Sequence, residues 1–466
     1  MTLATSAAGS GEMTYLQHAR RFLALGLPLI GSNLAQMAMN VTDTLMLGWY
    51  DVTALAAATL ATSMFFLLFI VGAGFAWAVM PVVAAAAEAG DEVQVRRVTR
   101  MGFWLGLCYS AVFLPPMLWS GQLFLWMGQE EEVALLAQSY LRIAAWSMVP
   151  GLMLLVLRSF LSALEHIGVL LWGTLAGVGL NAAMNYALIF GNWGAPELGV
   201  RGAAIATLVN MILGTILLGV YAAWKMPQYA LFQRLWRSDW EAFWRVARLG
   251  APIGLTSLAE GGLFSASAVM VGWIGAVPLA AHGIAIQITS VAFMVQVGLS
   301  QAATVRAGRA LGRVDEEALR RIARTGIVLA VLTSGLAGLV FLLLPEPLIK
   351  IFIDPNDPAR GAVIAIGIGL LAVAALFQVV DALQVMALGL LRGVQDTTMP
   401  MVFAAISYWG IGMPVGWVLG FPLGLGATGV WLGLVVGLSL AAVFLLWRFW
   451  RRSVRIGQEP GRASAG

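Results

Sequence analysis

Charged residues are scarce in this sequence. Asp, Glu, Lys and Arg together make up 11% of its 466 residues, while 60% of the residues are hydrophobic. An average soluble domain carries about 25% charged residues, and the mean hydropathy here is +0.86. A soluble protein of this composition would have too few polar side chains to cover its surface. The scarcity therefore excludes a soluble globular protein and indicates an integral membrane protein.

Cysteine and histidine are also nearly absent, with one Cys and three His in the chain. Cys108 alone cannot form an intramolecular disulfide, and in its apolar run we expect it to pack as a small residue. His18, His166 and His282 do not have metal-ligand spacing. Of these three only His282 could face a central cleft, and packing is the favoured interpretation. The sequence has no HExxH motif, serine elbow or Asp-rich prenyl diphosphate motif, so we expect no enzyme activity and no cofactor.

Long apolar runs are abundant. They measure about 20 residues or more and alternate with short polar joints, which is the pattern that crosses a hydrocarbon core of about 30 Å. We predict an all-α membrane protein with twelve spans, near residues 23–48, 54–84, 101–120, 137–158, 167–190, 202–224, 247–273, 279–305, 322–345, 361–391, 400–420 and 426–447.

The basic residues gather on one side of these spans if the N-terminus is cytoplasmic. Only four of the 27 Lys and Arg residues fall on the other side, namely Arg142, Arg201, Lys350 and Arg360. This asymmetry is the positive-inside pattern, and it accounts for the pI of about 9.4. We therefore predict that both termini are cytoplasmic and that the first 15 residues are a cytoplasmic lead, not a cleaved signal.

The second half of the sequence repeats the first at an offset of 224 residues. Residues 25–28 align with 249–252, and Met46, Gly48 and Trp49 align with Met270, Gly272 and Trp273. Six spans separate equivalent positions, so both halves have the same orientation and are related by a pseudo-two-fold axis along the membrane normal. Transporters commonly place their substrate path between two such lobes. A structural duplication without a transport role is the alternative.

The repeat and the polar joints divide the chain into five parts. Trp236, Trp240 and Trp244 recur every four residues with arginines between them, which predicts an amphipathic helix at the cytoplasmic interface. We interpret this helix as a tether between the lobes in preference to a lipid sensor. The predicted parts are a cytoplasmic lead (1–22), an N-lobe (23–224), an amphipathic linker (225–246), a C-lobe (247–447) and a cytoplasmic basic tail (448–466).

Three carboxylates lie inside predicted spans: Asp43, Glu260 and Asp381. A charge at the bilayer centre costs at least about 2.5–3.5 kcal/mol on insertion scales, so such residues indicate function. None of them has a Lys or Arg partner at helical spacing in its own span. Carboxylates in an apolar cavity can bind a proton or a small hard cation such as Na⁺. A buried acid satisfied by neighbouring amides is the structural alternative.

Each carboxylate belongs to a polar stripe on one helix face. Such faces must look at other helices or at a cavity. At the repeat offset Gln36 takes the place of Glu260, and Asp43 takes the place of Ser267, so the two lobes are not expected to be functionally equal. The amides Asn181 and Asn185 lie one turn apart in the fifth span. Candidate cavity-lining residues are Gln36, Asn40, Ser257, Gln287 and Gln378.

At these positions the chain resembles the multidrug and toxic compound extrusion (MATE) family, in particular its NorM-like branch. The resemblance covers nearly the whole chain, and the motifs occur in the family's order. They are Leu27-Pro28 with Gln36 and residues 41–44, Asn181 with Asn185-Tyr186, Pro252 with Glu260, and residues 378–381 with 389–393 and Asp396-Thr397.

This resemblance implies a V-shaped antiporter of two six-helix bundles in the bacterial inner membrane. It would export lipophilic organic cations and drugs in exchange for Na⁺ or H⁺, as a monomer that binds no nucleic acid. Asp43, Asn181 and Asn185 would form the N-lobe cation site. Glu260 and Asp381 would form the C-lobe site, with Na⁺ as one candidate ion, and Pro28 would be a hinge. Phe377 departs from the pattern, because some relatives have a tyrosine there.

The nearest alternative is a flippase of the same superfamily for lipid-linked oligosaccharides or peptidoglycan precursors. Such a protein needs a strongly cationic cavity to hold a pyrophosphate. Here Arg and Lys are nearly absent from the centres of the spans, where carboxylates lie instead. The sequence therefore favours a cationic cargo.

Overall fold

The computed structural model describes residues 14–456, and this part of the chain is helical with no strand. Its helices, in chain order, are α1 (Tyr15–Tyr50), α2 (Val52–Glu88), α3 (Glu92–Leu118), α4 (Ser120–Trp126), α5 (Glu131–Ala144), η1 (Ala145–Ser147), α6 (Met148–Ala163), α7 (Ile167–Phe190), η2 (Asn192–Gly194), α8 (Val200–Lys225), η3 (Pro227–Tyr229), α9 (Trp240–Ile274), α10 (Ala276–Arg313), α11 (Glu316–Leu343), α12 (Pro345–Lys350), α13 (Arg360–Gly393), α14 (Thr398–Ala405), η4 (Ile406–Gly412), α15 (Met413–Gly420), α16 (Gly426–Arg448) and η5 (Phe449–Ser453).

Within the described range, twelve helices are long and apolar enough to cross a membrane, which confirms the predicted number. The helix from α5 through α6 counts as one span, and so does the helix from α14 through α15. Several helices extend beyond the apolar runs, because polar residues cap their ends. Asp51, Asp91, Asp239 and Asp315 each accept a hydrogen bond from the backbone N–H three residues later, at the starts of α2, α3, α9 and α11.

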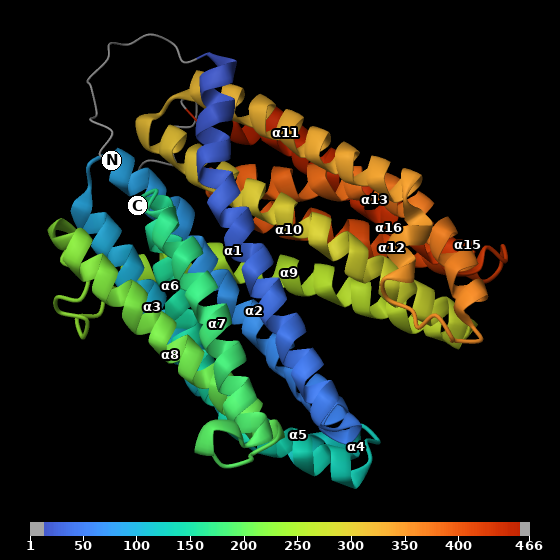
Figure 1. Ribbon diagram of the computed structural model, residues 1–466. Coiled ribbons are helices and arrows are strands. Elements are labelled where there is room, and N and C mark those ends of the chain that lie inside the picture. The colour runs from blue at the N-terminus through green and yellow to red at the C-terminus, as the bar shows by residue number, and fades with distance from the viewer. Residues whose placement is uncertain (1–13, 457–466) are drawn as a thin grey trace.

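The twelve spans form two bundles of six. The helices from α1 to α8 make the N-lobe, and those from α9 to α16 make the C-lobe. Figure 1 shows that the lobes meet at one end and diverge toward the other, where α4 and α5 lie far from α12 and α15. The molecule therefore has the predicted V shape.

The seam between the lobes is built from small residues. A Cβ atom on Gly74 of α2 would lie only 2.4 Å from the backbone nitrogen of Gly254 of α9. A Cβ atom on Gly298 of α10 would lie 2.8 Å from the backbone nitrogen of Ile30 of α1. Gly74 and Gly298 are equivalent in the repeat, and so are Ile30 and Gly254. The same close crossing is thus made twice, as expected of two lobes related by a two-fold axis.

The linker differs from its prediction. In place of an amphipathic helix, the segment between α8 and α9 has the short 3-10 helix η3 followed by turns, and helix resumes only at Trp240. Ala230 and Arg234 have φ angles of 46° and 53°, a left-handed conformation that interrupts a helix. Trp240 and Trp244 therefore belong to α9. Residues 1–13 of the predicted lead and 457–466 of the predicted tail lie outside the described residues.

Candidate functional site

Asp43 lies in the last third of α1, and two side chains of α7 point to it. The amide nitrogens of Asn181 and Asn185 each donate a hydrogen bond to Asp43 Oδ1 at 2.5 Å. Both asparagines are fully buried. Because they are one helical turn apart, they share the face of α7 that packs against α1. The structure thus brings together the three residues predicted for the N-lobe.

Two residues that the sequence did not indicate lie beside this cluster. Tyr140 of α5 lies next to Thr207 of α8 and close enough to Asp43 for the carboxylate charge to act on it. The side-chain oxygens of Asn181 and Asn185 are buried without a hydrogen-bond partner. Carboxylate and amide oxygens are the ligands that hard cations prefer. The N-lobe cluster could therefore hold Na⁺ or a proton.

Glu260 of α9 and Asp381 of α13 lie together inside the C-lobe, near enough for the charge of Glu260 to act on Asp381. Asp381 is 1% exposed, and both its carboxylate oxygens lack a hydrogen-bond partner, as does Glu260 Oε1. Gln378, one turn before Asp381, is fully buried and its amide group is equally unpaired. Buried polar groups are nearly always hydrogen-bonded. A cluster of unpaired oxygens in the protein interior fits a site that receives a cation or a proton.

The wall of this C-lobe cluster includes residues that were not predicted as site residues. The amide nitrogen of Gln384 donates to the hydroxyl of Tyr408 at 2.6 Å, and both side chains are fully buried. Tyr408 lies in η4, a π-helical segment, and such segments often mark functional sites. Arg392, in the last turn of α13, interacts electrostatically with Glu260. The sequence places Arg392 among the cytoplasmic charges and in the motif at residues 389–393, but it does not predict the contact with Glu260.

The two lobes carry their carboxylates at different depths. Asp43 is equivalent in the repeat to Ser267, which lies seven residues beyond Glu260, or about 10 Å along a helix. The hydroxyl of Ser267 donates to the Phe264 carbonyl within its own helix. The C-lobe therefore has no counterpart of Asp43 at that position.

The remaining predicted residues are dispersed. Gln36, Ser257 and Gln287 are half-buried, and Asn40 is exposed. Gln378, by contrast, lies wholly inside the C-lobe. The cavity-lining role of these residues stays a prediction. Pro28 lies within the continuous helix α1, two residues before Ile30 of the seam.

Phe377 and His282 both pack in the C-lobe core. Phe377 is 3% exposed, and its ring contacts Phe264 and Trp431 at centroid distances of 6.0 and 5.6 Å. The Trp431 ring nitrogen donates to His282 Nδ1 at 3.0 Å. These contacts agree with the packing interpretation of His282. Among the described residues, no three His, Cys, Asp or Glu side chains gather as a metal site.

The sequence and the fold both match known proteins. The MatE family model matches residues 28–187 and 252–418, two segments that begin at the equivalent prolines Pro28 and Pro252. Over 447 residues the chain is 47% identical to a probable multidrug resistance protein NorM of Rhizobium meliloti, and the match covers 95% of each chain. It is 42% identical over 445 residues to a protein of the same description from Agrobacterium fabrum, covering 94% of this chain and 95% of that one.

A solved structure has the same fold. It is the outward-facing conformation of a multidrug resistance MATE family transporter of the MOP superfamily, and it superposes with a TM-score of 0.84. The superposition covers 97% of this chain and 100% of that chain. At 21% sequence identity this likeness concerns the fold alone.

Proposed function

This chain belongs to the MatE family of multidrug and toxic compound extrusion transporters, and from that premise we propose that it exports lipophilic organic cations in exchange for Na⁺ or H⁺. It is a multi-pass membrane transporter and not an enzyme. The names of its relatives support a multidrug cargo, because two proteins 47% and 42% identical to it are described as probable multidrug resistance proteins NorM.

The observation that carries the ion-coupling part of the proposal is the pair of buried oxygen clusters. The N-lobe has Asp43 with two asparagine oxygens that lack partners, and the C-lobe has Glu260 and Asp381 with unpaired oxygens. Leaving such groups unsatisfied costs about 1–3 kcal/mol each. A transported cation or proton that binds there offsets this cost, so the coupling ion would stabilise one conformation of its lobe. No resident cofactor enters the proposal.

The V shape supports transport by alternating access. The basic side of the spans faces the cytoplasm under the positive-inside pattern, and the lobes meet at that side. The diverging ends would then face the outside, and the conformation seen here would be outward-facing. Rocking of the lobes about the seam would open the opposite side. The protein would act as a monomer in the bacterial inner membrane with both termini cytoplasmic.

The flippase alternative is less well supported. A pyrophosphate cargo requires cations near the centres of the lobes. Arg158 of α6, which donates to the Ser32 hydroxyl at 2.8 Å, and Arg392 of α13, which interacts with Glu260, lie toward the cytoplasmic ends of their helices. The unpaired groups deeper in the lobes include carboxylates, amides and serine hydroxyls.

The direct test is efflux of ethidium from proteoliposomes under an imposed Na⁺ gradient and then under an imposed pH gradient. We expect one of the two gradients to drive efflux by the wild-type protein. Asp43→Asn, Glu260→Gln and Asp381→Asn should each lower the driven rate at least about tenfold, because each removes the charge that binds the ion. Glu346→Gln is the matched control, since Glu346 is an exposed carboxylate of α12.

Efflux that responds to neither gradient would contradict the antiport mechanism. Cells expressing the protein should also tolerate ethidium or a fluoroquinolone better than cells without it. Unchanged tolerance in all three carboxylate variants would contradict the assignment of the ion sites, even if multidrug export were retained.

A further inference from the structure

A hollow lined by arginines lies apart from both carboxylate clusters, at the end of the molecule where the lobes meet. Its volume is about 520 Å³, and it is bounded by the first turns of α3 and by the segment that leads from the linker into α9. Five arginines line it: Arg96, Arg97, Arg100, Arg234 and Arg237. The transport mechanism proposed above uses none of them.

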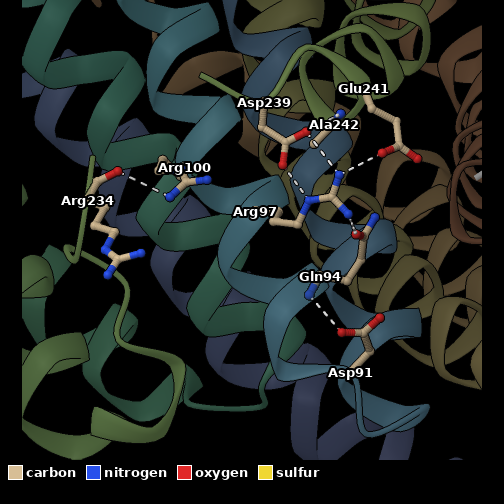
Figure 2. A network of polar contacts seen from close by, with 8 residues as sticks. All are labelled: Asp91, Gln94, Arg97, Arg100, Arg234, Asp239, Glu241 and Ala242. Carbon is tan, nitrogen blue, oxygen red and sulfur yellow. Dashed lines mark hydrogen bonds and ion pairs between the residues drawn. The ribbon is translucent and has the colours of Figure 1, made fainter. Parts of the chain in front are cut away.

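Within the described part of the chain, Arg97 is the one of these five arginines that forms an ion pair with a carboxylate. The guanidinium of Arg97 lies between two carboxylates, donating to Asp239 and, at 2.7 Å, to Glu241 (Figure 2). Within residues 14–456, the side chains of Arg96, Arg234 and Arg237 form no ion pair with a carboxylate. The hollow therefore has a large excess of positive charge.

Arg100 adds a second, independent indication of a missing ligand. Its side chain is 6% exposed, so it is more than nine-tenths buried. One of its terminal nitrogens donates to the carbonyl oxygen of Arg234 at 3.2 Å (Figure 2), while its Nε is buried without a partner. A buried charged donor without an acceptor is costly. Because Arg100 lines the hollow, an anion bound there would lie beside its guanidinium and offset its charge.

The surroundings of the hollow identify the kind of anion. The ring nitrogen of Trp104 donates to the carbonyl of Leu235 at 2.7 Å, beside the hollow. Trp236, Trp240 and Trp244 are 78%, 65% and 56% exposed. Exposed tryptophans at the ends of membrane spans lie at the level of the lipid headgroups. At that level the phosphate of a lipid is the anion that meets the hollow.

We propose that this hollow binds the phosphate headgroup of an anionic phospholipid from the adjacent leaflet. The phosphate oxygens would accept N–H groups of Arg96, Arg100 and Arg237, since guanidinium groups match the geometry of phosphate. The Arg97 contacts to Asp239 and Glu241 hold α3 against the start of α9 and so keep the walls of the hollow together. This inference does not depend on the coupling ion or on the cargo.

The test is lipid binding to the purified full-length protein, measured by native mass spectrometry with dioleoylphosphatidylglycerol and dioleoylphosphatidylcholine, and with inorganic phosphate as competitor. The double variant Arg96→Gln/Arg237→Gln is compared with Arg20→Gln/Arg451→Gln. The control removes the same charge from exposed arginines at the same end of the molecule but outside the hollow.

We expect the wild type to bind the phosphatidylglycerol at least about tenfold tighter than the phosphatidylcholine. In the hollow variant the affinity for phosphatidylglycerol should fall about fivefold per arginine removed, the equivalent of about 1 kcal/mol each. In the control variant this affinity should change less than about twofold. Equal weakening in both variants would overturn the proposal, because it would show a diffuse charge effect. So would the absence of a preference for phosphatidylglycerol, or its displacement by inorganic phosphate at equal concentration, which would indicate a soluble phosphate ligand.

Discussion

At the residue scale, the asparagines of α7 hold the N-lobe carboxylate in place. Asn185 donates to Asp43 at 2.5 Å and is fully buried. Asn185→Ala removes one of the two donors. A hydrogen bond to a charged group contributes about 1.5–3 kcal/mol, so we expect the affinity for the coupling ion to change by at least about tenfold. The measurement is the ion-concentration dependence of efflux in proteoliposomes.

Asn192→Ala is the control for this change. Asn192, at the start of η2, donates a hydrogen bond to the carbonyl oxygen of Tyr186 in α7 and lies seven residues beyond Asn185. Its removal should leave the ion dependence as it is. If both variants show the wild-type ion dependence, Asn185 does not act on the ion site.

The buried hydroxyl of Tyr408 belongs to the C-lobe core. It accepts a hydrogen bond from Gln384, whose side-chain oxygen already lacks a partner. Tyr408→Phe would leave the whole buried amide unsatisfied. We expect the free energy of unfolding to fall by about 1–3 kcal/mol, seen as a lower melting temperature in detergent. Tyr186→Phe, at an exposed position, should have almost no effect, and equal losses in both would contradict this account.

The sequence could indicate some of these residues and not others. Asp43, Glu260 and Asp381 were found because charges inside apolar runs are unusual. The one-turn spacing singled out the two asparagines, and the family resemblance implied that they join Asp43. Tyr408 could not be found in this way. It lies in the π-helical turn η4, which rotates the side chains away from the 3.6-residue period of an α-helix. Arg392 acts on Glu260 from another helix, and no spacing within one span predicts that contact.

At the scale of elements, ion pairs fasten the ends of helices from opposite lobes. Glu88, at the end of α2, contacts Arg313 at 2.5 Å and Arg309 at 3.7 Å, both near the end of α10. Glu165, after α6, contacts Arg309 at 2.9 Å. These pairs close the side on which the lobes meet, so under the proposed alternating access they would break when the lobes part there.

Glu88→Gln should therefore favour the conformation that is open on this side. Partly exposed pairs contribute up to about 1 kcal/mol each, so we expect the ratio of the two conformations to shift about fivefold or more. Electron spin resonance distances between spin labels at positions 228 and 451 would measure this ratio. The labels would be introduced in a Cys108→Ser background, because Cys108 is exposed and would also be labelled. Glu346→Gln breaks a pair inside the short helix α12 and is the control. An unchanged distance distribution would show that Glu88 does not hold the lobes together.

A second contact between elements joins α3 to the start of α9. The Arg97 guanidinium lowers the pKa of Asp239 from its ordinary value of 3.8. A lowered carboxyl pKa gives stability that is present above the unfolded value and is lost as the pH falls through the folded value. The contact should thus be fully formed from pH 5 to pH 8.

Asp239→Asn should accordingly lower the melting temperature by the same amount at pH 5 and at pH 8, through a loss of about 1–2 kcal/mol. Asn retains the helix cap, so the loss would come from the ion pair. Thermal unfolding at several pH values measures it. If the difference in melting temperature between the wild type and Asp239→Asn disappeared as the pH fell from 8 to 5, the Asp239 carboxylate would titrate in that range, contrary to this prediction.

The helices themselves were predictable to within a few residues where apolar runs define them, as for residues 167–190, which match α7. Their polar extensions were missed, because caps such as Asp239 depend on backbone geometry that hydropathy does not report. The prediction of a helical linker was wrong for a related reason. A four-residue tryptophan period favours a helix, but left-handed residues at Ala230 and Arg234 turn the chain before that helix can form.

At the scale of the whole molecule, the repeat would determine where the lobes pivot in the proposed alternating access. Ala84 of α2 and Gly308 of α10 are equivalent positions, and a Cβ on Gly308 would lie 3.0 Å from that of Ala84. Equivalent residues can touch only near the axis that relates them, so the two-fold axis passes between these helices. The paired crossings of Gly74 on Gly254 and of Gly298 on Ile30 lie to either side of it. Pro28 and Pro252 lie two residues before Ile30 and Gly254, so both prolines lie beside these crossings, where we propose that the lobes pivot.

The pivot should therefore tolerate no added side chain at either crossing. In Gly74→Ala the new methyl group would meet the backbone of α9, and in Gly298→Ala it would meet that of α1, neither of which can move without shifting a lobe. We expect each variant to lose about 1–3 kcal/mol of stability and most of its transport. Gly335→Ala, with open space around its Cβ position in α11, should be as stable as the wild type or more so. Because the crossings are related by the repeat, Gly74→Ala and Gly298→Ala should have similar effects in melting and efflux measurements. A large loss in one and none in the other would show that the lobes turn about a single helix pair and not about the axis between them.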